Sequence, residues 1–408
     1  MNRYEFTLTR DYVSSWTYIE AIRELLQNAY DYENLNPQSK AMVKISKSQH
    51  SIKISNKNDK VSIKDLLMGH GTKRYSSDQV GGFGEGFLLA LLVLIRNGYE
   101  VFITNCNEVW TCSFEHSETF EEDLFVVSVT QEESTHKDFD IEIHGLLDSQ
   151  IDTLKNKFLG LGSKYKSIST KYGEILVDPS QKGKMYVQGL PITEDVDFTY
   201  GYNFKPQYVK LDRDRKEINH RDLKNITALA IAYMEEYNFQ LLDDLVQKGG
   251  SDVDYIVSKS IEVPDNFVSG YADYLKEKIG IKDTDVVVTE TSNKIVTELK
   301  RQGENVVTVK KKIVEEVLNQ SLEYSHTRLQ EVSDKISKRD KIEEAWNDYK
   351  YSTYKTLRDW KVKYGKNLTR EALSGLDDIL ESLEPYGFNL IKEEVLKRED
   401  ELKDGKEQ

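Results

Sequence analysis

The sequence predicts an α+β fold in which helices cover one face of a mixed or antiparallel sheet. In the N-terminal third, segments in which apolar and polar residues alternate, as they do in half-buried strands, follow an amphipathic helix. An unbroken apolar run from Phe87 to Ile95 adds a buried helix. The chain of 408 residues is long enough for two or three domains, each with its own core.

The N-terminal elements can be placed individually. Residues 14–33 are predicted to form the amphipathic helix, and Thr17 and Glu20 have the spacing of a capping box at its start. Strands are expected where the alternation is clearest, at residues 43–45, 51–55, 100–105, 109–114, 124–130 and 139–144.

Glycine-containing turns divide the rest of the chain. A helix over about 147–159 leads into a predicted hinge at 160–163, and residues 248–252 form a second boundary. We therefore expect a first α+β domain over 1–160, a second small α/β domain over 161–248 and a mixed, then helical region over 249–408. Further strands are predicted at 174–177, 184–188, 208–211, 286–289 and 306–309, with a helix at 223–236. The heptad signal over 310–362 is too irregular for a coiled coil.

The composition excludes several classes of protein. A net charge of −14 argues against broad, nonspecific attraction to nucleic acid and slightly favours protein partners. The run of three lysines at 310–312 is expected on a solvated face. No apolar run approaches the roughly 18 residues of a membrane-spanning helix, and the N-terminus lacks a signal-peptide pattern. Two cysteines, Cys106 and Cys112, do not suggest a disulfide framework, so a cytoplasmic location fits best.

The predicted N-terminal helix carries a candidate catalytic face. Glu24, Asn28 and Asp31 stand at i, i+4 and i+7, and so share one side of the helix. Phosphoanhydride hydrolysis needs a base that positions water and a ligand for the metal that neutralises the developing charge. Glu24 is the candidate base, and the carboxamide oxygen of Asn28 is the candidate Mg²⁺ ligand. The alternative is a solvated polar face on an ordinary surface helix.

A glycine-rich stretch at 81–86 is the second candidate feature. Closely spaced glycines let backbone N–H groups approach an anion, and the helix that follows adds its positive end. The alternative is a tight turn into a buried helix, which needs fewer glycines. Just upstream, residues 69–73 supply a flexible backbone, a hydroxyl and a cation, and the seven residues between Lys73 and Gly81 could form a short lid over a bound nucleotide. His70 is expected to be an ordinary polar loop residue rather than a metal ligand.

These motifs, in this order, resemble the GHKL ATPase superfamily, which includes gyrase B, the ninety-kilodalton heat-shock chaperone, MutL and the MORC ATPases. The resemblance covers roughly residues 10–145 and implies a Bergerat-type ATP-binding sandwich that hydrolyses ATP with Mg²⁺. It implies that Glu24 is the general base, that Asn28 binds Mg²⁺ and that Asp31 lines the pocket. It also implies a lid edge at Gly69, Gly71, Thr72 and Lys73 and nucleotide contacts at Gly81, Gly82, Phe83, Gly84, Glu85 and Gly86.

The segment after the second predicted strand departs from the family pattern, which is Asp-x-Gly-x-Gly. Here Asn56 stands at the aspartate position, and Asn58 and Lys60 replace the two glycines. The carbonyl oxygen of Asn56 can accept from the adenine amino group, whereas its amide could donate to guanine, so both bases stay open. Asp59 could supply the missing carboxylate if the turn is rearranged.

A cation from the second domain is expected to sense the γ-phosphate, as in related enzymes. The segment 210–216 offers Arg213 and Arg215, because a guanidinium binds phosphate in a bidentate manner. The choice between these two arginines is open, and so is the alternative of a surface turn with paired opposite charges.

The motifs favour a nucleotide-gated clamp in which ATP closes the lid and joins two protomers, and hydrolysis reopens them. Dimerisation is implied by the resemblance, and the partner could be a protein or DNA. The alternative is a nucleotide-gated binding or scaffold protein with little or no hydrolysis. A histidine kinase is disfavoured because such kinases usually lack a base like Glu24. A topoisomerase subunit is disfavoured because no room remains for DNA-cleaving domains.

Overall fold

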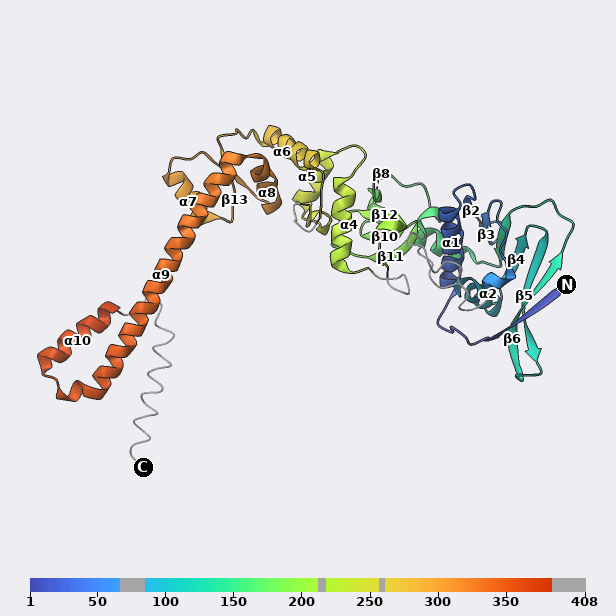
Figure 1. Ribbon diagram of the computed structural model, residues 1–408, viewed down its shortest axis with the longest axis horizontal. Helices are drawn as coiled ribbons and strands as arrows, with labels where there is room; N and C mark the ends of the chain where they lie inside the picture. The colour runs from blue at the N-terminus through green and yellow to red at the C-terminus, as the bar shows by residue number, and fades with distance from the viewer. Residues whose placement is uncertain (67–84, 212–217, 257–260, 384–408) are drawn as a thin grey trace, which may run out of the picture. The chain divides into compact units, whose positions relative to one another are not determined.

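The computed structural model describes residues 1–66, 85–211, 218–256 and 261–383 (Figure 1). The chain forms two compact units, Met1–Tyr274 and Leu275–Gln408. The boundary between them falls within helix α6 (Asp265–Ile279). The boundaries expected near residues 160 and 248 both lie inside the first unit, and the predicted three-part division stays a prediction.

A seven-stranded antiparallel sheet forms the N-terminal part of the first unit. Its strand order is β1-β6-β5-β4-β7-β3-β2, and all neighbouring strands pair antiparallel. The six strands predicted in this region are confirmed, while the edge strand β1 was not predicted. The bounds are β1 Asn2–Thr9, β2 Ala41–Ser46, β3 Ser51–Asn56, β4 Glu100–Asn105, β5 Glu108–Ser117, β6 Glu122–Gln131 and β7 Phe139–His144.

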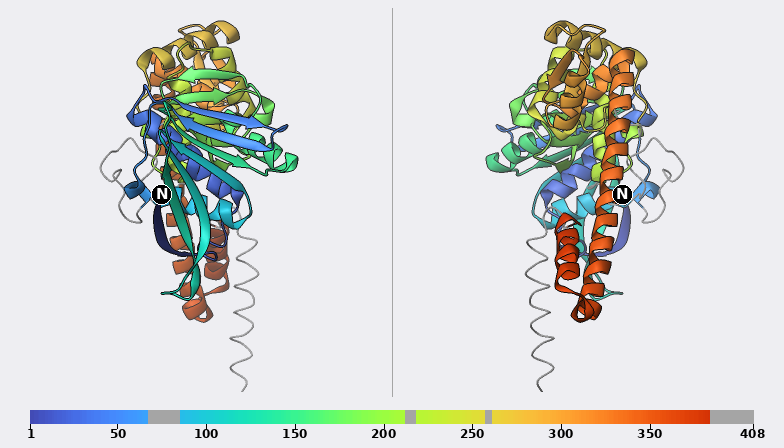
Figure 2. Two further views of the ribbon diagram at one scale, coloured as in Figure 1. Left: turned by 90° about the vertical axis from the view of Figure 1, so that its right-hand side faces the viewer. Right: turned by 90° about the vertical axis from the view of Figure 1, so that its left-hand side faces the viewer.

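Helices α1 (Tyr18–Leu35) and α2 (Gly86–Arg96) pack on one face of this sheet and share its apolar core. In the left view of Figure 2 the strands lie in front of these helices. The capping box is confirmed, because Thr17 N–H donates to Glu20 Oε2 at 2.8 Å. The buried apolar helix is confirmed as α2. On the opposite face Phe102 is exposed. The predicted α+β class, with helices on one face of an antiparallel sheet, is therefore confirmed.

A second, mixed sheet of five short strands follows α3 (Asp148–Lys157), in the order β11-β10-β12-β9-β8. Only β10 and β12 pair parallel. The strand predicted at 208–211 is wrong: Pro206 starts a 3-10 turn, Pro206–Tyr208, because its ring fixes φ and removes a donor. The bounds are β8 Ser167–Thr170, β9 Gly173–Leu176, β10 Lys184–Val187, β11 Leu190–Glu194, β12 Gly201–Phe204, α4 His220–Ala232 and α5 Phe239–Lys248.

The second unit begins with two parallel strands, β13 (Val286–Thr289) and β14 (Val306–Val309), as predicted. Helix α7 (Asn293–Arg301) makes the crossover that parallel strands require. Helices α8 (Lys312–Ser321), α9 (Glu323–Tyr364) and α10 (Arg370–Leu383) follow. The first turns of α9 pack on β13 through Val332 and Ile336. None of the helices in the described ranges is both long and apolar enough to cross a membrane.

Short 3-10 helices connect several of these elements. Besides the turn at 206–208, they are Ile63–Leu66, Leu159–Leu161, Pro179–Gln181, Ser251–Val253 and Gly365–Asn367.

Candidate functional site

The polar face of α1 is largely buried: Gln27 and Asp31 are buried, and Glu24 and Asn28 are partly buried. Glu24, Gln27, Asn28 and Asp31 lie within about 100° of one another around the helix axis, at 100° per residue. Gln27 and Asp31 are each only 1% exposed, and the Glu24 side chain is 19% exposed. Since the apolar face of α1 already packs on the sheet, both sides of this helix are covered.

Two amide side chains on this face have unused hydrogen-bonding capacity. Both amide atoms of Gln27, and Nδ2 of Asn28, are buried and have no hydrogen-bond partner among the residues that the structure describes. Leaving a buried polar group unsatisfied costs about 1–3 kcal/mol. A polar ligand bound beside α1 would remove this cost. The sequence analysis assigned no role to Gln27, although its position three residues after Glu24 places it on the same face.

Glu24 lies directly against the first turn of α2. A Cβ added at Gly86 would stand 2.3 Å from Glu24 Oε2 and 3.1 Å from Glu24 Cδ. The first N–H groups of a helix have no partner within the helix, and its macrodipole makes this end positive. Arg23 Nη1 lies 3.7 Å from Glu24 Oε1. The fold therefore brings Glu24 and Gly86, two predicted site residues 62 positions apart, into contact at the positive end of a helix.

Glu85 is the N-cap residue of α2. Its side chain makes no capping hydrogen bond to the N–H groups of the first turn.

Asn56, the last residue of β3, is also held against α1. Its Nδ2 donates to the backbone oxygen of Ala29 at 2.9 Å, and the residue is 4% exposed. Since a backbone oxygen can only accept, this contact fixes which end of the amide is the nitrogen and turns Oδ1 away from Ala29. Two residues on, Asn58 has φ +52°, the left-handed conformation that glycine and asparagine adopt more readily than other residues.

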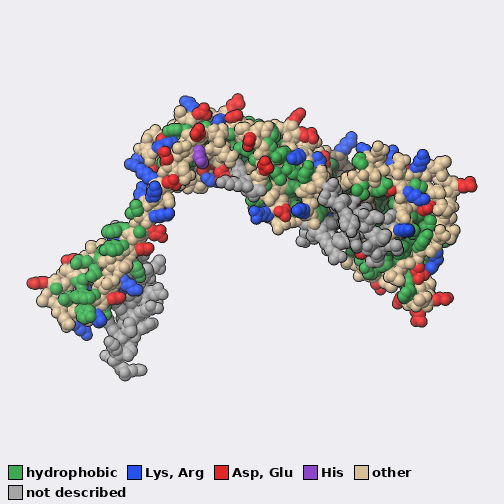
Figure 3. Space-filling view, in the orientation of Figure 1, with side chains coloured by type: hydrophobic (Ala, Val, Ile, Leu, Met, Phe, Trp, Pro, Cys, Tyr) green, Lys and Arg blue, Asp and Glu red, His purple; other side chains and the backbone are tan. Residues whose placement is uncertain are grey.

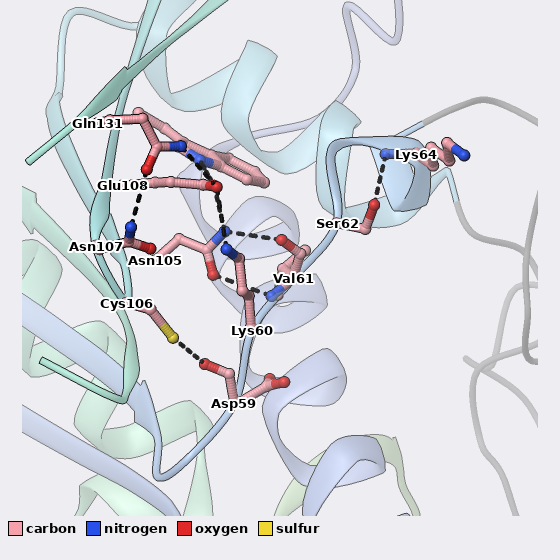
Figure 4. Close-up of polar contacts among 11 residues, drawn as sticks. Asp59, Lys60, Val61, Ser62, Lys64, Asn105, Cys106, Asn107, Glu108 and Gln131 are labelled. Atoms are coloured by element: carbon pink, nitrogen blue, oxygen red, sulfur yellow. Dashed lines mark hydrogen bonds and ion pairs between the residues drawn. The ribbon is translucent and has the colours of Figure 1, made fainter.

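The loop after Asn58 is tied to the β4–β5 hairpin by a polar network (Figure 4). Asn105 donates to Val61 O at 2.7 Å and accepts from Val61 N at 3.0 Å. Lys60 Nζ pairs with Glu108 Oε1 at 3.2 Å, and Trp110 Nε1 donates to Glu108 Oε2 at 3.1 Å. Burial acts to raise the pKa of Glu108, but the hydrogen bonds from Trp110, Gln131 and Lys60 outweigh it and lower that pKa. The loop that departs from the family pattern is thus held in place by hydrogen bonds and an ion pair to the β4–β5 hairpin.

Asp59 belongs to the same loop and faces α1. It is 5% exposed, and its backbone oxygen accepts from Cys106 Sγ at 3.3 Å. Burial, together with a hydrogen bond to the Asp59 carboxylate, raises the pKa of Tyr32 of α1 to about 12. The carboxylate that could replace the family aspartate therefore contacts the helix that carries Glu24.

The other predicted site residues lie outside the described residues, so their roles stay predictions. Within the described ranges, no group of three or more His, Cys, Asp or Glu side chains could hold a metal ion. The Mg²⁺-binding role of Asn28 also stays a prediction. The residues outside are Gly69, Gly71, Thr72, Lys73, Gly81, Gly82, Phe83, Gly84, Arg213 and Arg215.

Comparisons with known proteins match parts of the chain. The family described as the Mycoplasma pneumoniae MPN635 N-terminal domain matches residues 149–235, which include the second sheet. An uncharacterized protein of Mycoplasma pneumoniae (strain ATCC 29342 / M129 / Subtype 1) is 25% identical over 218 residues, covering 51% of this chain and 87% of the relative.

Two solved structures of the ATPase region of Saccharomyces cerevisiae topoisomerase II, one of them bound to ICRF-187 (dexrazoxane), are also similar. Their TM-scores are 0.30 and 0.27, each at 14% sequence identity. Both matches cover 43% of this chain and 62% of the solved chain, so this chain spans about three fifths of their length. TM-scores of this size do not assign the fold.

Proposed function

We propose that this protein binds ATP and hydrolyses it with Mg²⁺ in the manner of the GHKL ATPases. The observation that carries the proposal is the contact between the Glu24 carboxylate and the first turn of α2, next to the unsatisfied amides of Gln27 and Asn28. A carboxylate, carboxamides and a helix N-terminus are together what a phosphate chain with a divalent cation and a water nucleophile requires.

Each residue on the polar face of α1 and at the start of α2 has a role in the proposed reaction. Glu24 accepts a hydrogen bond from the attacking water and takes its proton as the water oxygen bonds to the γ-phosphorus. The bond from that phosphorus to the β-γ bridging oxygen breaks at the same time, and ADP leaves. The N–H groups at the start of α2 bind phosphate oxygens, and the missing side chain of Gly86 leaves room for the Glu24 carboxylate to lie beside them. The carboxamide oxygen of Asn28 holds the magnesium ion, which supplies positive charge that neutralises the phosphates. Gln27 is a further hydrogen-bonding group for the phosphate chain or its waters.

Adenine is the base that Asn56 suits better. One of the two hydrogens on its nitrogen is used by Ala29 O, so the amide offers two acceptor sites on Oδ1 against one remaining donor. An acceptor recognises the amino group of adenine, whereas the O6 of guanine needs a donor. Asp59, held nearby by Tyr32, offers a second acceptor.

The remaining parts of the proposal come from the resemblance. The resemblance implies a lid edge at residues 69–73 and nucleotide contacts at residues 81–84. Arg213 or Arg215 senses the γ-phosphate, and two protomers join when ATP binds. The clamp then acts on a protein or nucleic-acid partner.

The experiment compares nucleotide binding with hydrolysis in the full chain. Isothermal titration with ATP and with GTP, each with and without Mg²⁺, is paired with phosphate release for the wild type and Glu24→Gln. We expect ATP to bind more tightly than GTP, Mg²⁺ to strengthen binding, and Glu24→Gln to bind ATP while releasing at least about 100-fold less phosphate. Glu100→Gln, an exposed glutamate at the start of β4, is the matched control.

Three results would contradict parts of the proposal. Phosphate release at the wild-type rate in Glu24→Gln removes Glu24 as the base. ATP binding without release by the wild type makes the chain a nucleotide-gated binding protein. The absence of binding to either nucleotide overturns the proposed function as a whole.

A further inference from the structure

The distal part of α9 carries a row of exposed aromatic and aliphatic side chains. Ile342, Trp346, Tyr349, Trp360 and Tyr364 are between 41% and 70% exposed. Trp346 stacks on Tyr349 with ring centroids 5.7 Å apart, and Trp360 lies 5.6 Å from Tyr364. Figure 3 shows hydrophobic side chains along this part of the second unit. So many exposed large aromatic residues on one helix indicate a binding surface.

These five side chains form a single stripe. At 100° per residue they fall within an arc of about 60° around α9, and Thr353 and Thr356 continue the same arc between the two tryptophans. Helix α10 packs on another side of α9, through the ion pair of Lys361 with Asp377, about 90° around the axis from the stripe. The neighbouring helix therefore leaves the stripe uncovered.

The charge of this stretch is opposite to that of the whole chain. Residues 335–364 contain nine Lys and Arg and five Asp and Glu, a net charge of +4 in a protein of net charge −14. By the same helical geometry, all five acidic residues lie outside the arc of the stripe. Lys338 and Arg339 border the arc at its N-terminal end and are exposed. Lys350 Nζ lies 5.7 Å from the Trp346 ring, and Lys363 Nζ lies 5.2 Å from the Tyr364 ring.

The chemistry of the stripe discriminates between possible occupants. A coiled coil with a second copy would bury Arg339, Thr353 and Thr356 in its seam, where apolar residues are needed. A membrane-surface helix needs a broad apolar face, which this narrow stripe does not offer. Flat aromatic rings beside cations are what bases and phosphates together require.

We propose that this stripe of α9, from Lys338 to Tyr364, binds a single strand of nucleic acid. Its bases stack on Trp346, Tyr349, Trp360 and Tyr364, and its phosphates lie along Lys338, Arg339 and the flanking lysines. At 1.5 Å per residue the stripe is about 39 Å long. At about 3.4 Å per nucleotide this length accommodates roughly 11 nucleotides. The inference uses only α9 and is independent of the proposed ATP site.

The test is fluorescence anisotropy of a labelled oligothymidylate of about 15 nucleotides, long enough to cover the stripe. The full chain is compared with Trp346→Ala/Trp360→Ala and with the control Tyr351→Ala/Val362→Ala, which removes two exposed apolar side chains outside the arc. We expect the tryptophan variant to raise Kd at least about tenfold, since each stacked base contributes about 1–3 kcal/mol, and the control to stay within about twofold. A duplex should bind more weakly, because its bases are not available for stacking.

The salt dependence tests the phosphate contacts separately. For a single strand, each neutralised phosphate contributes a slope of about −0.7 to the plot of log affinity against log salt. Lys338→Gln/Arg339→Gln should therefore make the slope shallower by about 1.4. Lys341→Gln/Lys355→Gln, exposed lysines on the far side of α9, should leave the slope unchanged.

Defined outcomes overturn the proposal. One is no binding of the oligonucleotide at low salt, and another is equal loss in both aromatic variants. A third is a wild-type dimer that Trp346→Ala/Trp360→Ala dissociates while oligonucleotide affinity is unchanged, which assigns the stripe to a second copy. A fourth is that anionic vesicles bind through the stripe and the oligonucleotide does not compete. Circular dichroism checks that each variant keeps its helix content, and Glu24→Gln should bind the oligonucleotide like the wild type.

Discussion

Replacing Gly86 with alanine perturbs the position of Glu24 by an amount that the structure sets. The new Cβ would stand 2.3 Å from Glu24 Oε2, whereas ordinary contact begins at 3.4 Å, so the carboxylate must move by about 1.1 Å. The atom that must move is the end of a flexible side chain rather than backbone, so the fold can accommodate it. A misplacement of about 1 Å in a catalytic group can cost about 100-fold in rate.

We therefore expect Gly86→Ala to lower the rate of ATP hydrolysis and to leave the free energy of unfolding nearly unchanged. Gly86→Ala should reduce ATP hydrolysis by about 10- to 100-fold. Its unfolding free energy should stay within about 1 kcal/mol of the wild type, because the higher helix propensity of alanine offsets the local crowding. Phosphate release under saturating ATP and urea unfolding measure the two quantities.

A matched glycine provides the control. Gly375, within α10, has nothing within 4 Å of an added Cβ. Gly375→Ala should stabilise the chain by about 0.5–1 kcal/mol and leave hydrolysis unchanged. The double variant Gly86→Ala/Glu24→Ala should be no slower than Glu24→Ala alone, because both changes act through one carboxylate. Wild-type hydrolysis by a folded Gly86→Ala chain would refute the reasoning, as would a loss of stability as large as that of a core cavity.

Two further predictions concern stability. Thr17→Ala removes the N-cap of α1 and should cost about 1 kcal/mol. Burial acts to raise the pKa of Glu20, but its hydrogen bonds with Thr17 lower it overall, so this contribution is present above the unfolded pKa of 4.5 and is lost as the pH falls below it. Urea unfolding at pH 7 and pH 3.5 should show a smaller loss on acidification for Thr17→Ala than for the wild type, and equal losses would contradict this. Asn56→Asp places a carboxylate against Ala29 O and should destabilise the chain by about 1–3 kcal/mol; an unchanged urea midpoint would show that the Ala29 contact does not matter.

Elements with a clear local pattern were predictable from the sequence, and elements without one were not. The apolar run of α2 and the capping box of Thr17 identify their helices locally. Strand β1, at the edge of the sheet, has only one buried residue, Leu8, so its pattern is weak and its pairing with β6 is a tertiary effect. Strand β12 contains Gly201 and Asn203, residue types that are depleted in strands, whereas the equally short β13 consists of β-branched residues and was predicted.

The sequence predicted which residues share the polar face of α1. It did not predict which other parts of the chain these residues contact. Spacing places Glu24, Asn28 and Asp31 on one side of α1, yet it cannot show that this side is buried. The approach of Glu24 to Gly86 depends on how α1 and α2 cross, which no local pattern encodes. The orientation of Asn56 depends on Ala29 O, a backbone atom that sequence patterns do not report.

The most direct test of the central claim is phosphate release by Glu24→Gln under conditions in which titration shows ATP to be bound. The claim predicts ATP affinity close to that of the wild type and phosphate release reduced at least about 100-fold, with Glu100→Gln unchanged. Phosphate release at the wild-type rate by Glu24→Gln with ATP bound would contradict the claim that the polar face of α1 carries the residue that activates water for hydrolysis.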